Sequence, residues 1–281
     1  MTSKKIAIIT DIHGNLFLLN KVLKELEKEN IDDYIFCGDN ITDGFDNEKI
    51  LNKIKSLTSN VILGNREKSI LEYDNKSWQN KKQWKSMLYT YNSLSKENLD
   101  YLKTLNIYKI ITINNVKICI SHGSPYNIRD LVCFNSYEIF DKLIADFNCD
   151  IYLFGHTHKE YMTKYKDKLF INTGTLSLPT NNKAVSTYGI LTIDEKDIKY
   201  TLKEYKYDFK KIKEYYCNSD YHKICNEWCN LILYTLKYGI DYSNIFIEFL
   251  NKYCNNDEEK KNQLWEETFK EFMQKNNLEI L

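Results

Sequence analysis

The sequence predicts an α/β fold with a largely parallel sheet, followed by an α-helical extension. Three short apolar segments near the N-terminus are each followed by a polar loop and then by apolar residues at helical spacing. Such β-to-α units are typical of parallel sheets, which collect functional groups at the carboxyl ends of their strands. Beyond residue 207 only helical periodicity is present. We therefore expect one domain over residues 1–207 and a helical extension, packed on it, over residues 208–281.

The first half of the chain contains the predicted β-to-α units. The strands are continuously apolar and end in polar residues: Ile6–Thr10, Tyr34–Cys37 and Val61–Leu63. Helices are predicted after them over Leu16–Asn30, Glu48–Lys55 and, in several pieces, Lys68–Leu105. Ser95 is the expected N-cap of the last piece. The segment Lys68–Leu105 is predicted to form a cap over the site that the strand ends create.

The second half is dominated by predicted hairpins. Three pairs of strand-like segments flank polar turns: Ile107–Ile113 with Val116–Ile120, Tyr161–Tyr165 with Leu169–Ile171, and Thr187–Ile193 with Ile198–Tyr207 around Asp194–Asp197. A helix over Ser136–Phe147 and a buried strand over Ile151–Phe154 lie between the first two pairs. The extension is predicted to hold four helices: Phe209–Tyr216, Tyr221–Tyr238 stopped by Gly239, Ser243–Tyr253 and Glu258–Lys275.

The composition argues against several classes of partner. Lys and Arg total 39 and Asp and Glu total 39, so the net charge gives no reason to expect nucleic acid or an anionic membrane. No apolar stretch approaches the roughly 20 residues that span a bilayer, and Met1–Lys5 leads into a strand rather than a signal sequence. The 8 cysteines are scattered, as expected of small buried side chains in a reducing compartment. We expect a cytoplasmic protein without a disulfide framework.

Potential metal ligands follow the predicted strands. Of the 5 histidines, all but His222 stand at the ends of apolar runs. One such histidine is usually a polar loop residue, but four together indicate ligands. Two carboxylates and an amide occupy equivalent positions, which gives seven candidates: Asp11, His13, Asp39, Asn65, His122, His156 and His158.

The types and the number of these ligands indicate the chemistry. Mixed carboxylate, imidazole and amide ligands suit manganese, iron or zinc rather than a thiolate-rich structural zinc site. Seven ligands are too many for one ion but fit two ions that share a bridging carboxylate. Two ions about 3.5–4 Å apart can clamp a phosphoryl group and lower the pKa of bound water to about 7. The pattern therefore predicts phosphoester hydrolysis.

In their order, five motifs resemble those of the calcineurin-like metallophosphoesterase family over about residues 1–205: Asp11-Ile12-His13, Gly38-Asp39, Gly64-Asn65, Ser121-His122-Gly123 and Gly155-His156-Thr157-His158. The segment Asp11–Leu16 is similar to that of small bacterial members. The resemblance implies a four-layer α/β/β/α sandwich of two mixed sheets. It also implies a dimetal phosphodiesterase or phosphatase that acts on a small, nucleotide-like phosphoester.

The resemblance further implies a division of the ligands. Asp11, His13 and His158 would hold one ion, and Asn65, His122 and His156 would hold the other. Asp39 would bridge the ions, and a metal-bridging hydroxide would attack phosphorus. Asp39, Asn65 and His122 thus belong to the catalytic group together with Arg66. Small relatives usually use manganese, with iron, zinc, nickel or magnesium as alternatives.

Arg66 departs from the family pattern, which commonly has histidine after the amide ligand. Arginine stays protonated, so it can bind phosphate through two N–H groups but is a poor general acid. Our hypothesis is that Arg66 stabilises charge in the transition state and that the enzyme favours good leaving groups. Alternatively, Arg66 pairs with a neighbouring carboxylate such as Glu67.

Two loops and one cluster have less specific signals. Asn172–Thr175 resembles the family's Asn-Pro-Gly-Ser loop, and Gly174 would permit its tight turn. The segment Asn40–Asp46 either contacts substrate or, as its Asp and Asn content favours, forms a solvated turn. His222, Cys225 and Cys229 share a helical face, but the absence of a CxxC pair favours buried side chains over a metal site.

The competing function is a catalytically weak or inactive metal-binding scaffold that binds other proteins, as the vacuolar sorting subunit of the same fold does. Degenerate scaffolds usually lose a metal ligand, whereas this chain keeps all seven positions. Ligand completeness therefore favours the enzyme.

Overall fold

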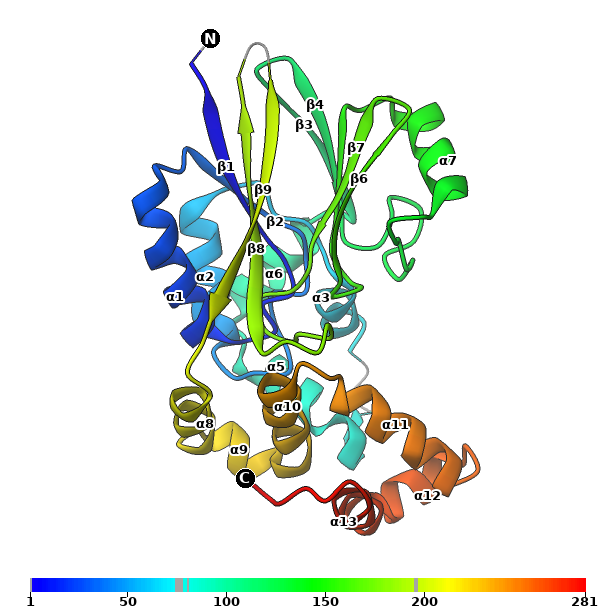
Figure 1. The fold of residues 1–281 in the computed structure, drawn as a ribbon. Helices are drawn as coiled ribbons and strands as arrows, with labels where there is room; N and C mark the ends of the chain where they lie inside the picture. The colour runs from blue at the N-terminus through cyan, green and yellow to red at the C-terminus, as the bar shows by residue number, and fades with distance from the viewer. Residues whose placement is uncertain (1, 74–77, 80, 195–196) are drawn as a thin grey trace.

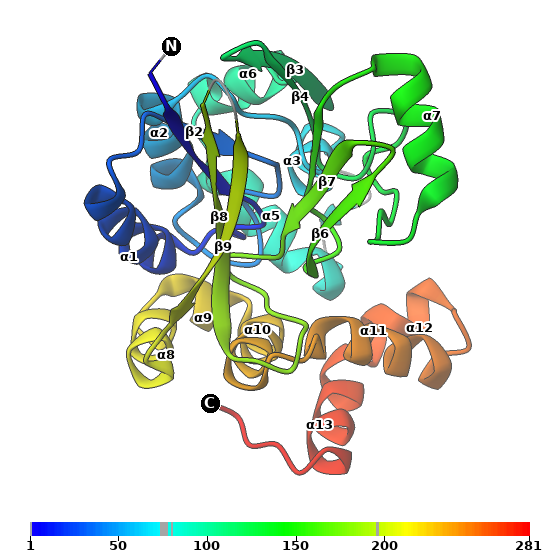
Figure 2. The same ribbon diagram turned by 45° about the horizontal axis from the view of Figure 1, so that its top comes forward.

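The computed structural model describes residues 2–73, 78, 79, 81–194 and 197–281. Two sheets stand face to face with helices on their outer sides, and the C-terminal helices gather at one end of both sheets (Figure 1). A second view shows α1 (Leu16–Leu26) and α2 (Asn47–Leu57) outside the first sheet and α7 (Tyr137–Phe147) outside the second (Figure 2). This arrangement confirms the α/β sandwich with a C-terminal helical extension.

Both sheets are mixed. The first has the order β2-β1-β8-β9, formed by Asp33–Phe36, Lys4–Ile9, Val185–Ile193 and Ile198–Lys206. The second has the order β3-β4-β5-β7-β6, formed by Tyr108–Ile113, Val116–Ser121, Ile151–Phe154, Lys168–Thr173 and Glu160–Tyr165. Only β1 with β2, β4 with β5, and β5 with β7 pair in parallel among these strands. The expectation of a largely parallel sheet was wrong, because hairpins supply the other strands.

The predicted strand Val61–Leu63 is reduced to one isolated bridge between Phe36 and Val61. The Ile62 amide donates to the Phe36 carbonyl at 3.2 Å, but the next amide, that of Leu63, donates to the carbonyl of Asn106 at 2.9 Å. The chain thus leaves β2 after one residue pair, and no ladder can form.

The helices of the first domain begin and end close to the predicted positions. They are α1 Leu16–Leu26, the 3₁₀ turn η1 Glu27–Glu29, α2 Asn47–Leu57, α3 Asn65–Leu71, η2 Lys82–Trp84, α5 Lys85–Ser93, α6 Lys96–Thr104 and α7 Tyr137–Phe147. The Ser95 side chain accepts a hydrogen bond from the Asn98 amide at 3.2 Å, which confirms the predicted N-cap. Parts of the predicted helical stretch, at 74–77 and 80, and of the turn Asp194–Asp197, at 195–196, lie outside the described residues.

The extension contains more and shorter helices than predicted. They are α8 Phe209–Cys217, α9 Asp220–Ile224, α10 Asn226–Tyr238, α11 Tyr242–Tyr253, α12 Glu258–Gln263 and α13 Trp265–Lys275. The predicted continuous helices Tyr221–Tyr238 and Glu258–Lys275 were wrong, because the backbone leaves the helical region at Cys225 and Leu264. Buried apolar residues continue across both breaks, so periodicity did not reveal them. Gly239 ends α10 with φ 68°, as predicted.

The central strand of the second sheet, β5, is buried on both faces. In β5, Ile151 and Leu153 point into the core between the sheets, where they pack with residues such as Ile8. Tyr152 and Phe154 point the other way and pack against α7. Burial on both sides explains the continuously apolar sequence of this strand.

The extension contacts the first domain through polar side chains as well as apolar ones. The indole N–H of Trp228 in α10 donates to Asp43 at 2.8 Å, and the hydroxyls of Tyr221 and Ser86 are 2.8 Å apart. The Lys82 amide donates to the Asn262 side chain at 2.7 Å. Within the described ranges, no helix is long and apolar enough to cross a membrane.

Candidate metal centre

The seven predicted ligands come from both sheets and meet at one end of the sandwich. Asp11 and His13 follow β1, Asp39 follows β2, His122 follows β4, and the remaining histidines follow β5. Asn65 is the first residue of α3. Five of the seven have positive φ angles: Asp11 55°, His13 47°, Asp39 50°, His156 67° and His158 55°. Such backbone geometry costs free energy in residues with a Cβ and tends to occur at functional sites.

One group of ligand atoms comes from Asp11, His13 and His158, which all lie within 4.8 Å of one another. The Nε2 atoms of the two histidines are 3.2 Å apart. Asp11 Oδ1 lies 3.1 Å from His158 Nε2 and 3.6 Å from His13 Nε2. These three residues form the first set that the family resemblance implies.

A second group comes from Asp39, His122 and His156, again within 4.8 Å. Asn65 joins it, because its Oδ1 lies 3.0 Å from His122 Nε2. Asp39 Oδ2 lies 3.4 Å from the same nitrogen, while Oδ1 accepts the Arg66 backbone N–H at 2.8 Å. The structure therefore brings all seven predicted residues together, and the bridging role of Asp39 stays a prediction.

The hydrogen bonds of three histidine rings indicate that their Nε2 atoms are available to bind cations. Nδ1 of His122 faces the Cys37 carbonyl at 2.8 Å, Nδ1 of His158 faces the Leu178 carbonyl at 2.8 Å, and Nδ1 of His13 faces an Asp43 oxygen at 3.0 Å. Carbonyl and carboxylate oxygens only accept, so each Nδ1 donates its proton.

In the neutral rings, Nε2 therefore carries a lone pair, and the Nε2 atoms of His13 and His158 point at each other and at Asp11. Asp11 Oδ1 is buried without a well-directed hydrogen bond among the described residues. Acceptors that converge in this way need a proton or a metal ion between them.

The electrostatics lead to the same conclusion. Burial lowers the pKa of His13, but the adjacent carboxylates of Asp11 and Asp43 outweigh it and raise that pKa to about 10. Burial also lowers the pKa of His122, but the negative charge of Asp39 and a hydrogen bond with it outweigh burial and raise that pKa to about 9. Burial and the neighbouring His122 lower the pKa of His156 to about 4. The carboxylates thus draw positive charge onto two imidazoles, and metal binding would release these protons.

The side chain of Arg66 is 31% exposed and forms an ion pair with Asp43 at 3.1 Å. Glu67, the partner proposed from sequence, is instead buried and accepts backbone N–H groups of Asp39 at 3.0 Å, Asn40 at 2.6 Å and Gly64 at 2.9 Å. The alternative that Arg66 pairs with a carboxylate is confirmed, but the partner is Asp43. The suggested partner Glu67 was wrong, because Glu67 holds the loop that carries Asp39.

The segment Asn40–Asp46 is buried, so the expectation of a solvated turn was also wrong. Asn40, Thr42 and Asp43 are at most 1% exposed. Asp43 contacts His13, Arg66 and Trp228. Sequence reasoning missed the role of Asp43, and the density of Asp and Asn in this loop was its only signal.

The loop Asn172–Thr175, which resembles the family's Asn-Pro-Gly-Ser loop, has a structural role. The Asn172 side chain donates to the Gly155 carbonyl at 2.7 Å and to the Thr157 hydroxyl at 3.1 Å. Gly174 has φ 85°, as its tight turn requires. The loop therefore supports the backbone that carries His156 and His158.

A cavity of about 460 Å³ opens over the ligands. Its walls include three cationic side chains and the start of α11: Arg66, Arg129, Lys159, Asp241, Ser243 and Asn244. The described residues in 68–105 do not line it, so this part of the segment does not form the predicted cap, and residues 74–77 and 80 lie outside the described residues. The described helices of this segment instead pack against Leu51 of α2, in a cluster that includes Ile70, Met87 and Leu102.

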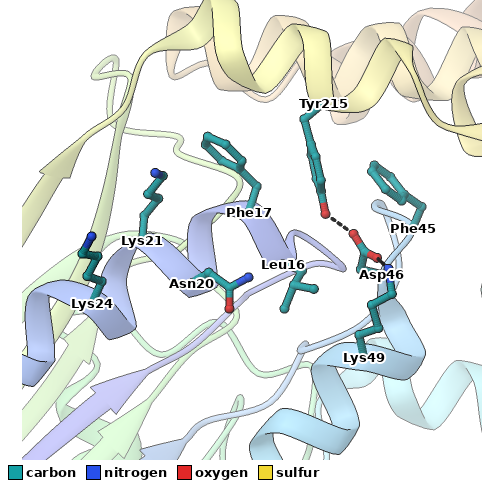
Figure 3. Close-up of a pocket in the computed structure, with 9 residues that line it drawn as sticks. All are labelled: Leu16, Phe17, Asn20, Lys21, Lys24, Phe45, Asp46, Lys49 and Tyr215. Carbon is teal, nitrogen blue, oxygen red and sulfur yellow. Dashed lines mark hydrogen bonds and ion pairs between the residues drawn. The ribbon is translucent and has the colours of Figure 1, made fainter.

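A separate pocket of about 480 Å³ lies between α1, the start of α2 and α8 (Figure 3). Its walls carry the aromatic rings of Phe17, Phe45 and Tyr215, and the Tyr215 hydroxyl donates to Asp46. None of the seven predicted ligands lines it. His222, Cys225 and Cys229 likewise form no potential metal group among the residues that the structure describes.

Comparison with known proteins adds a family assignment. The family model described as the calcineurin-like phosphoesterase superfamily domain matches residues 5–196. An uncharacterised protein of Methanocaldococcus jannaschii is 25% identical over 76% of this chain and 92% of its own. A phosphodiesterase of the same organism is 22% identical over 69% of this chain and 95% of its own.

The fold is also similar to solved structures. A metallophosphoesterase from Sphaerobacter thermophilus superposes with a TM-score of 0.67 and 19% identity, covering 85% of this chain and 100% of that chain. At this identity the likeness concerns the fold alone.

Proposed function

The chain belongs to the calcineurin-like phosphoesterase superfamily, and from this membership we propose that it is a dimetal-dependent hydrolase of phosphodiesters or phosphomonoesters. A small, nucleotide-like phosphoester is the proposed substrate. Manganese is the proposed ion, with iron, zinc, nickel or magnesium as alternatives. The observation that carries the proposal is the convergence of Asp11, His13 and His158 on one point and of Asp39, His122 and His156 on another.

The chain's own residues prepare this site for phosphate. His13, His122 and His158 donate their Nδ1 protons to fixed acceptors, which directs each Nε2 lone pair toward the centre. When bound, two divalent ions would lower the pKa of a water molecule and supply the nucleophile.

The cations of the cavity would bind the substrate. Arg66, Arg129 and Lys159 place positive charge beside the metal ligands, where the oxygens of a phosphoester would lie. The Asp43 carboxylate orients the Arg66 guanidinium. Because Arg66 keeps its proton, we assign it charge stabilisation and no proton transfer.

The proposal is tested with metal-stripped protein. We expect it to be inactive and to regain hydrolysis of nitrophenyl diesters, nitrophenyl monoesters or nucleotides after addition of manganese, iron, zinc or magnesium. Inactivity with every ion and substrate class would contradict the proposal and favour the metal-binding scaffold. Retention of all seven ligands in one place supports the enzyme over that alternative.

A further inference from the structure

Three histidines of the metal centre are held through Nδ1, but by different kinds of acceptor. His122 and His158 donate to the backbone carbonyls of Cys37 and Leu178. His13 donates to a carboxylate, Asp43, at 3.0 Å. A carboxylate partner makes an imidazole a stronger metal ligand than a carbonyl does, and it fixes the ring and its tautomer.

Asp43 is only 1% exposed, so its carboxylate depends on hydrogen-bond donors from the protein, and it has several. Oδ2 accepts from His13, from the Thr42 hydroxyl at 3.1 Å and from the Arg66 guanidinium at 3.1 Å. Oδ1 accepts the indole N–H of Trp228 at 2.8 Å. This last donor belongs to α10, so the helical extension reaches the partner of a proposed metal ligand.

We propose that Asp43, fixed by the indole of Trp228, is a positioning residue through which the C-terminal helices set the metal affinity of the Asp11–His13–His158 position. The inference rests on the proposed function, because it takes these three residues as metal ligands. Trp228 secures Oδ1, which leaves Oδ2 directed at His13 and Arg66. Loss of the indole N–H would let the carboxylate rotate and would weaken the hold on His13.

The geometry predicts an effect on one ion and not on the other. Asp43 contacts His13, whereas His122 in the second group is held by the Cys37 carbonyl and faces Asn65 and Asp39. The second position is therefore an internal reference within the same molecule. A general loss of packing would lower both affinities, whereas a loss of His13 orientation lowers one.

The experiment measures binding of Mn²⁺ to the metal-stripped full chain by calorimetry and chelator competition. Trp228→Phe removes the N–H and keeps most of the ring. Asp43→Asn keeps the shape and removes the charge. Tyr234→Phe is the matched control, because it removes a donor from the same helix whose partner, the Glu279 carbonyl at 2.6 Å, lies away from the site.

We expect Asp43→Asn to weaken one of the two Mn²⁺ sites by roughly 10- to 100-fold, the usual cost of losing such a partner. Trp228→Phe should weaken the same site by a smaller factor, and Tyr234→Phe should change neither. Melting temperatures of the metal-free variants measure their folding separately. The inference would be overturned if Asp43→Asn weakened both Mn²⁺ sites equally. It would also be overturned if Trp228→Phe and Tyr234→Phe bound Mn²⁺ with the same affinities.

This readout separates the inference from the proposed function. Wild-type protein that binds two ions without hydrolysing any ester would overturn the proposed function, while the affinities of the variants would still decide the inference. Active wild-type protein with unchanged Mn²⁺ affinity in Asp43→Asn would overturn the inference alone. If Asp43→Asn does not fold, the comparison of Mn²⁺ affinities between Trp228→Phe and Tyr234→Phe still tests the inference.

Discussion

At the scale of single residues, Asp39 is the ligand whose substitution tests the proposed sharing of one carboxylate. Its Oδ2 lies near His122 at 3.4 Å, and its Oδ1 accepts the Arg66 N–H at 2.8 Å. Asp39→Asn keeps the shape but removes the negative charge that both ions would share. We expect metal content and turnover to fall together, measured by elemental analysis and by nitrophenyl ester hydrolysis. Unchanged turnover at full metal content would exclude the bridging role.

Arg66 tests the chemistry of the leaving group. A guanidinium that stays protonated stabilises charge but gives no proton to an alkoxide, so wild-type protein should hydrolyse aryl esters faster than alkyl esters. Arg66→His introduces the residue that is common in the family at this position, and it should raise the ratio of alkyl to aryl turnover. The control is Arg66→Lys, which keeps the charge and should leave that ratio low. Equal wild-type rates on alkyl and aryl esters would contradict this role.

The residues that sequence reasoning located and those it missed differ in a physical way. The seven ligands were predictable because each stands at the end of an apolar run and carries a metal-binding group. The contact of Trp228 with Asp43 was not, since it joins positions 185 residues apart. Neither Asp43 nor Trp228 stands out from its neighbours in the sequence. Partners of ligands that come from distant segments leave no spacing pattern, and only the folded chain reveals them.

At the scale of elements, the predictions held where one local signal determines the structure. The turn residues Asn114 and Asn115 both have positive φ, and the flanking strands pair as a hairpin. The strand Val61–Leu63 failed because pairing depends on a neighbour, and Leu63 bonds to Asn106 instead of continuing along β2. Periodicity also gave no evidence for two sheets, which came from the family resemblance.

The end of α10 offers a test of how the extension is fixed to the sheet domain. Gly239 has φ 68°, and a Cβ there would lie 2.5 Å from the backbone N of Lys183. Gly239 also accepts the Asn182 amide at 2.9 Å. Gly239→Ala should therefore destabilise the protein by more than the roughly 1 kcal/mol of left-handed strain alone.

The matched control for Gly239→Ala is Asn148→Ala at the end of α7. Asn148 is exposed and has φ 43°, but it already carries a Cβ. It should lose only the asparagine preference for this conformation, a few tenths of a kcal/mol. Denaturant unfolding measures both free energies. Equal losses in the two variants would mean that the contact with Lys183 is not a constraint.

At the scale of the whole molecule, the proposed ions would connect the two sheets. The first position combines Asp11 and His13 from the β1 end with His158 from the β5 end, and the second combines Asp39 with His122 and His156. An ion at either position binds the folded chain and has no equivalent site once the sheets separate. Metal binding should therefore stabilise the protein as a whole, by about 2.7 kcal/mol for each site at a free ion concentration 100 times its dissociation constant.

This coupling predicts how the melting temperature responds to metal. Addition of Mn²⁺ to metal-stripped protein should raise the melting temperature, and a chelator should reverse the rise. His158→Ala removes one ligand from the first position and should reduce the rise, because one ion then binds weakly. His222→Ala is the control, since His222 lies in α9 outside both ligand groups and its loss should leave the rise intact. A melting temperature that does not depend on Mn²⁺ would contradict this coupling. The two sheets would then gain no stability from metal ions bound between them.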